Sequence, residues 1–184
     1  MAPANLHHAE SGVGEALVLV HGFPFDGKMW SGQLDALSEQ ARVLAPDLPG
    51  FGDSSALPGN AEDTSMGDYA AELAGWARDM GITRLTLAGH SMGGYVAMAF
   101  ARLYPDMLAR LVLVCTRPGP DTDEGRQGRY KMVEAVKERG PQAVVEGMLP
   151  KLVSDATRQI RPEVAQQVEE IMQRQSVDGI VAAL

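Results

Sequence analysis

The residues most able to do chemistry are the pentapeptide Gly-His-Ser-Met-Gly at positions 89–93. It lies between an expected strand, Leu85–Ala88, and an expected helix that begins near Met92. A sharp strand-to-helix turn presents a serine oxygen at the end of a sheet, and glycines two positions away remove side chains that would collide. The helix N-terminus below the serine favours developing negative charge. The pattern predicts Ser91 as a catalytic nucleophile, and the residues expected to be structural around it are Gly89, His90 and Gly93.

A second candidate is the sequence His-Gly-Phe-Pro at residues 21–24, directly after an expected strand, Leu17–Val20. Acyl transfer needs two backbone N–H groups aimed at the oxygen on which negative charge develops. We expect one from Met92, which follows the nucleophile, and the other from Phe23 in this earlier loop. The residues of the loop that we expect to be structural are His21, whose ring would hold the turn, and Gly22.

Other residues are weaker evidence for a functional site. Phe25 and Trp30 are predicted to bind substrate as part of an apolar acyl pocket, although most such residues are core. Cys115 is the only cysteine, so no intramolecular disulfide or cysteine-based zinc site can form. We expect it to be a small hydrophobe at the end of a buried strand. The acidic residues at 121–124 are expected to be a solvated linker, and we predict neither a metal nor a cofactor.

These residues must be positioned by the elements around them. Short apolar runs alternate with helical patterns over the first two thirds of the chain, which predicts a mostly parallel sheet with helices on both faces. The expected strands are Leu17–Val20, Arg42–Ala45, Leu85–Ala88 and Leu111–Val114, with a weaker one near Leu6–Glu10. The expected helices between them span residues 29–40, 65–80 and 92–104. Only helical patterns follow Pro118-Gly119-Pro120, so we predict a core over residues 1–118 and a helical lid over 119–184.

Three motifs together resemble the α/β-hydrolase superfamily. Residues 21–24 resemble its oxyanion loop, Asp-Leu-Pro-Gly-Phe-Gly-Asp-Ser at 47–54 is similar to its Asp-x-Pro-Gly-x-Gly-x-Ser loop, and residues 89–94 resemble its nucleophile elbow. We expect the 47–54 loop to be a shaped turn without a catalytic group. The chain looks most like the serine esterase and lactonase branch, which includes 3-oxoadipate enol-lactonases and pimeloyl-carrier methyl ester esterases. The resemblance implies a three-layer fold and a Ser91 nucleophile that hydrolyses small carboxylic esters or lactones.

The sequence departs from this family after the nucleophile. The family order is nucleophile, acid, histidine, whereas no histidine follows Ser91; the four present are His7, His8, His21 and His90. We therefore expect the chain to lack the triad acid and histidine, with a sheet incomplete at its C-terminal side and a partial lid, as in a C-terminally truncated hydrolase. Ser91 should have a positive φ, and no histidine ring should lie within about 3 Å of its oxygen. The free edge of Leu111–Val114 should then permit self-association.

The composition of the chain limits which other functions are open to it. The chain has 184 residues, 45% of them hydrophobic, and a net charge of −8 with no basic face for a nucleic acid. No apolar run approaches the roughly 20 residues of a membrane span, and the N-terminus does not resemble a signal peptide, so we expect a cytoplasmic protein. Two other functions stay open: a non-catalytic small-molecule-binding protein or inert fragment, and a cofactor-free haloperoxidase or perhydrolase.

Overall fold

The computed structural model describes residues 6–184, and its centre is a five-stranded sheet in the order β1-β3-β2-β4-β5. Strands β2 to β5 run parallel where they pair, and β1 is antiparallel to β3. The strands are β1 His8–Ser11, β2 Ala16–Val20, β3 Arg42–Pro46, β4 Leu85–His90 and β5 Leu108–Val114. The expected mostly parallel sheet is confirmed, and the weaker expected strand near Leu6–Glu10 is the antiparallel β1.

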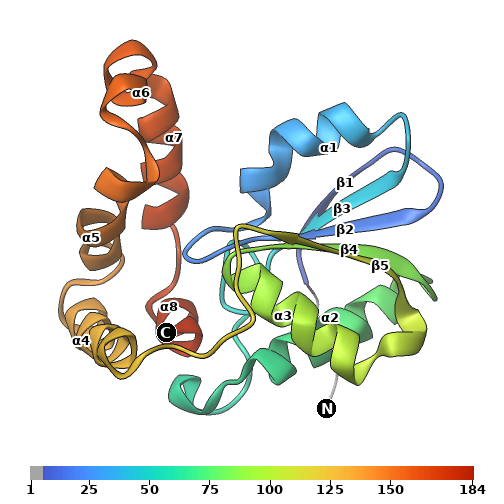
Figure 1. Ribbon diagram of the computed structural model, residues 1–184, viewed down its shortest axis with the longest axis horizontal. Coiled ribbons are helices and arrows are strands. Elements are labelled where there is room, and N and C mark those ends of the chain that lie inside the picture. The colour runs from blue at the N-terminus through green and yellow to red at the C-terminus, as the bar shows by residue number, and fades with distance from the viewer. Residues whose placement is uncertain (1–5) are drawn as a thin grey trace.

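Helices cover both faces of the sheet, which gives three layers (Figure 1). Helix α1, Ser31–Leu37, lies on one face, and α2, Met66–Asp79, and α3, Met92–Leu103, lie on the other. Three short 3₁₀ helices complete this part: η1 Gly27–Trp30, η2 Ala61–Asp63 and η3 Pro105–Met107. The helix expected over 29–40 is divided into η1 and α1, and it ends at Leu37 because the chain must turn back into β3.

The residue pattern explains these layers. Strand β2 is a continuous apolar run, Ala-Leu-Val-Leu-Val, as expected where helices cover both faces of a parallel sheet. Helix α2 begins with a capping box in which the side chains of Ser65 and Asp68 bond each other's backbone N–H groups. Its buried side chains, which include Leu73 and Trp76, pack with those of α3 against the sheet. A smaller apolar cluster around Trp30 and Leu34 fills the α1 side.

After β5 the described chain contains only helices, which are α4 Asp123–Arg139, α5 Gln142–Leu152, α6 Asp155–Ile160, α7 Pro162–Gln173 and α8 Val177–Ala183. We call residues 123–183 the helical segment. It stands beyond the carboxyl ends of β2, β4 and β5 (Figure 1), and it has its own apolar cluster, to which Phe25 of the core contributes. Whether residue 118 divides two domains stays a prediction. No helix of residues 6–184 is long and apolar enough to cross a membrane.

Strand β5 differs from the other parallel strands because it lies at the edge of the described sheet. The side chains of Leu111, Val112 and Leu113 are 37%, 44% and 46% exposed. Since successive strand residues point to opposite faces, both faces of β5 are open to solvent.

Candidate active site

Ser91 occupies the turn between β4 and α3 with φ 51° and ψ −114°. This conformation is unfavourable for a residue with a side chain, and such strain persists only where the surrounding structure enforces it. The expected positive φ of Ser91 is confirmed. Its amide donates a hydrogen bond to the Val114 carbonyl at 2.9 Å, which extends the β4–β5 pairing by one residue.

Two glycines make this turn possible because backbone atoms occupy the space where their side chains would be. A Cβ on Gly89 would lie 2.5 Å from the carbonyl carbon of Gly93. A Cβ on Gly93 would lie 2.5 Å from the His21 carbonyl oxygen and 2.9 Å from the Val20 carbonyl carbon. The first turn of α3 therefore packs directly on the end of β2, and this contact brings the 21–24 loop beside Ser91.

A cavity of about 360 Å³ is lined by Ser91, Phe23 and Met92 together. The N–H groups of Phe23 and Met92 have no backbone or side-chain acceptor among the described residues. The Met92 N–H belongs to the first turn of α3, where helix geometry supplies no acceptor. The structure thus brings together the serine and both backbone groups that the sequence predicts as oxyanion donors; their catalytic roles stay predictions.

His21 is fully buried, and both of its ring nitrogens are engaged. Its Nε2 accepts the backbone N–H of Leu48 at 2.9 Å, so Nδ1 carries the proton and donates to the Gly22 carbonyl at 3.0 Å. Burial lowers the pKa of His21 and keeps the ring neutral. These contacts tie the 21–24 loop to the loop after β3, in keeping with the expected structural role.

The His90 ring lies against Gly22 and Trp30. A Cβ on Gly22 would lie 2.6 Å from its Nδ1, and its ring meets that of Trp30 edge-on at 6.3 Å. Its Nδ1 is buried without a hydrogen-bond partner among the described residues, and burial lowers its pKa. Among residues 6–184, no hydrogen bond joins a histidine ring to the Ser91 hydroxyl; the expected lack of a triad histidine stays a prediction.

Three sequence expectations need correction. Phe25 and Trp30, expected to bind substrate, are 8% exposed and pack in two different apolar clusters, so the cavity beside Ser91 is lined by neither. Both side chains are apolar and large, and each is buried by the cluster in which it packs. Cys115, expected in a buried position, is exposed because β5 lies at the edge of the described sheet.

The sequence interpretation missed the contribution of the helical segment to this cavity. Gly125, Gly128, Arg129 and Met132 of α4 line it, as does Met148 of α5. The spacing of the α4 residues by three or four places them on one helix face, and this periodicity was the available signal. Arg129 forms an ion pair with Asp121, which lowers the pKa of that carboxyl group.

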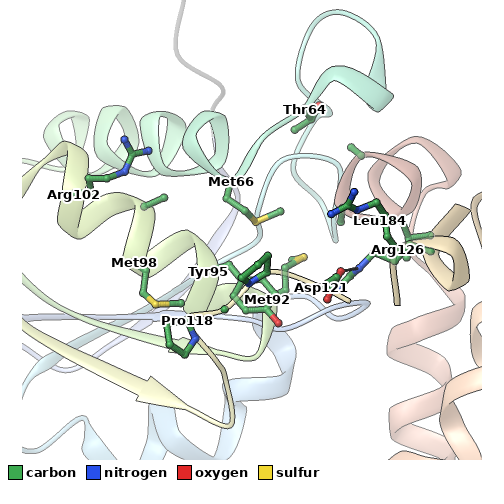
Figure 2. Close-up of a pocket in the computed structure, with 16 residues that line it drawn as sticks. Thr64, Met66, Met92, Tyr95, Met98, Arg102, Pro118, Asp121, Arg126 and Leu184 are labelled. Carbon is green, nitrogen blue, oxygen red and sulfur yellow. Dashed lines mark hydrogen bonds and ion pairs between the residues drawn. The ribbon is translucent and has the colours of Figure 1, made fainter. Parts of the chain in front are cut away.

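A larger cavity of about 780 Å³ adjoins this one and shares Met92, Tyr95 and Arg129 with it. Figure 2 shows Met92 and Tyr95 near its middle, with Arg102 of α3 at one end and Arg126 of α4 at the other. The cavity therefore runs from α3 to the helical segment, beside the proposed nucleophile.

The 47–54 loop contains a buried polar centre at Asp47. Asp47 is 4% exposed, and its carboxylate accepts the N–H of Gly27 at 2.7 Å and that of Asp53 at 3.0 Å. Asp47, Asp53 and His7 offer ligand-type atoms within 4.8 Å of one another. Arg174 already pairs with Asp53 at 2.8 Å, and this contact lowers the pKa of Asp53. The carboxylates thus have protein partners, and the loop serves as a shaped turn.

The same loop fastens the helical segment to the core. The Gln175 side chain accepts the Gly52 N–H at 2.8 Å and donates to the buried carboxylate of Asp26 at 3.1 Å. The Ser176 hydroxyl donates to the Gly50 carbonyl at 2.7 Å. We call residues 174–176, with these contacts, the polar anchor.

Comparison with known proteins agrees with this geometry. The α/β-hydrolase fold family matches residues 15–158, so the chain belongs to that family. Among solved structures it is similar to a thermophilic esterase from Thermogutta terrifontis, at 39% identity and a TM-score of 0.90, over 96% of this chain and 64% of that one. An enol-lactonase from Burkholderia xenovorans LB400 shares the fold, with 24% identity and a TM-score of 0.87 over 98% of this chain and 70% of that one.

A curated relative is the (E)-2-((N-methylformamido)methylene)succinate hydrolase of Acinetobacter baylyi, which is 30% identical over 132 residues. The match covers 72% of this chain and 44% of that relative. The chain therefore spans less than two thirds of the length of these relatives, apart from the lactonase.

Proposed function

We propose that this α/β-hydrolase chain carries the nucleophile and oxyanion hole of a serine hydrolase for carboxylic esters or lactones. The observation that carries the proposal is the cavity in which strained Ser91 meets the free N–H groups of Phe23 and Met92. A carbonyl group placed there would lie beside a nucleophile and two donors for its developing charge.

In the proposed reaction the Ser91 oxygen forms a bond to the carbonyl carbon and gives up its proton to a base. The carbonyl oxygen becomes negative and accepts hydrogen bonds from the Phe23 and Met92 N–H groups. The C–O bond to the leaving oxygen then breaks as that oxygen gains a proton, and an acyl group remains on Ser91. Water attacks this acyl group, which releases the acid and restores the serine.

The lining of the cavity supports a small acyl group of mainly apolar character. Phe23, Met132 and Met148 supply the apolar wall, while Arg129 is occupied by Asp121. The likeness to an esterase at 39% identity supports ester chemistry over other reactions of the fold. The described residues supply no histidine base at Ser91, so the proposal assigns this chain the nucleophile and oxyanion donors, and leaves the base to another group.

A fluorophosphonate probe tests the proposal because it reacts with activated serines. Without a histidine base at Ser91 we expect slow labelling of the full chain, located at Ser91 by peptide mapping, because the Phe23 and Met92 N–H groups still stabilise the charge that develops on the reacting probe. The Ser91→Ala variant should not be labelled, while Ser38→Ala, at the end of α1, should react like the wild type. Absence of labelling at Ser91 would contradict the proposal and favour a non-catalytic binding protein. Hydrolysis of p-nitrophenyl acetate should be slow without a histidine base.

A further inference from the structure

Thr116, just after β5, contacts the backbone of Ser91. Its hydroxyl donates a hydrogen bond to the Ser91 carbonyl at 2.8 Å, and its side chain fills the space where Gly94 lacks one. A Cβ on Gly94 would lie 2.6 Å from the Thr116 side chain. Thr116 therefore touches both the proposed nucleophile and the first turn of α3.

The β4–β5 pairing explains why this residue reaches the serine. The register aligns His90 with Val114, and the Ser91 N–H bonds the Val114 carbonyl at 2.9 Å. In a regular parallel ladder, the next bond would run from the N–H of residue 116 to the Ser91 carbonyl. Here the chain turns at Cys115, with φ 47°, and the Thr116 hydroxyl makes that bond in place of a backbone N–H.

We infer that Thr116 is a positioning residue for the Ser91 nucleophile, an inference that rests on the proposed function. The Val114 carbonyl accepts the Ser91 N–H, while the Ser91 carbonyl accepts both the Thr116 hydroxyl and, at 2.9 Å, the Gly94 N–H of α3. Thr116 thus supplies the restraint on the Ser91 carbonyl that comes from the β5 side. Strain of this kind needs such restraints to persist. Without the hydroxyl, Ser91 relaxes and its oxygen leaves the orientation in which it reacts.

The first test compares fluorophosphonate labelling rates at Ser91 in the full chain. Thr116→Val keeps the shape of the side chain and removes the donor, so labelling should slow about three- to tenfold, the range for one hydrogen bond. Thr116→Ser keeps the donor and should restore most of the rate. The matched control Thr86→Val removes a hydroxyl near the start of β4 and should react like the wild type. An unchanged rate in Thr116→Val would overturn the inference.

Amide exchange of Ser91, followed by NMR, separates this inference from the proposed function. If the wild type is not labelled, the proposed function fails, and exchange alone decides the role of Thr116. Exchange at Ser91 should accelerate in Thr116→Val but not in Thr116→Ser, and equal exchange in the two variants would refute the role. Thr116→Ala, which cannot crowd Gly94, gives the same comparison if the valine variant does not fold.

Discussion

Replacing Gly93 by alanine should be one of the most destabilising small changes in this chain. The added methyl group would lie 2.5 Å from the His21 carbonyl oxygen and closer still to that of Val20, both of them backbone atoms of the β2 end. Backbone atoms cannot adopt another rotamer as a side chain can, so α3 must move away from the sheet. Overpacking of a core costs about 1–3 kcal/mol, and we expect the upper end of that range.

The matched control is Gly128→Ala, because Gly128 lies within α4 with no atom within 4 Å of its missing Cβ. Alanine there should stabilise the helix by about 0.5–1 kcal/mol. A loss of about 3 kcal/mol should lower Tm by about 6–12 °C in a chain of this length, as measured by calorimetry or circular dichroism. If Gly93→Ala melts within about 2 °C of the wild type, the close contact between α3 and β2 is wrong.

Three further outcomes can be measured. Gln175→Ala leaves the buried Asp26 carboxylate without one of its donors, which should cost about 1–3 kcal/mol in urea unfolding and accelerate amide exchange in α8. Burial lowers the pKa of His21 below its ordinary 6.5, so protonation of His21 favours the unfolded chain. The free energy of unfolding should therefore be highest above about pH 6.5 and should fall as the pH drops further. A flat profile from about pH 7 to 5 would contradict this. The open edge of β5 should make the chain self-associate in size-exclusion with light scattering, with Leu113→Lys shifting it toward monomer; a monodisperse wild-type monomer would refute the prediction.

The sequence was sufficient for the sheet and for the residues that meet at its end. Continuous apolar runs such as Leu17–Val20 are unambiguous because a strand covered on both faces leaves no polar alternation. The glycines around Ser91 predicted a tight turn, and the structure shows the backbone atoms that require them. The burial pattern of a strand and the backbone geometry of the Ser91 turn depend on residues that are neighbours in the chain, so the sequence is enough to predict both.

Contacts between distant segments were not predictable in the same way. The type of Phe25 and its place in the chain predict a pocket residue, but the helical segment supplies the cluster that buries it. The sequence predicts both a free edge at Leu111–Val114 and a buried Cys115; the first agrees with the described sheet and the second does not, because the apolar type of a residue does not report whether another strand covers it. The polar anchor joins Gln175 to Asp26 across 149 positions, and single polar residues carry no periodicity that would identify such a partner.

The parallel sheet explains why the residues of the proposed site come from the ends of three different strands. Parallel strands place all their carboxyl ends at one edge, so residues that follow β2, β4 and β5 meet there. Phe23 follows β2 and offers an N–H group, Ser91 follows β4 and offers the nucleophile, and Thr116 follows β5 and fixes the serine. An antiparallel pairing of any of these strands would send its contribution to the opposite edge. The alternation of strand and helix along the chain is therefore itself a requirement of the chemistry, because it makes the pairing parallel.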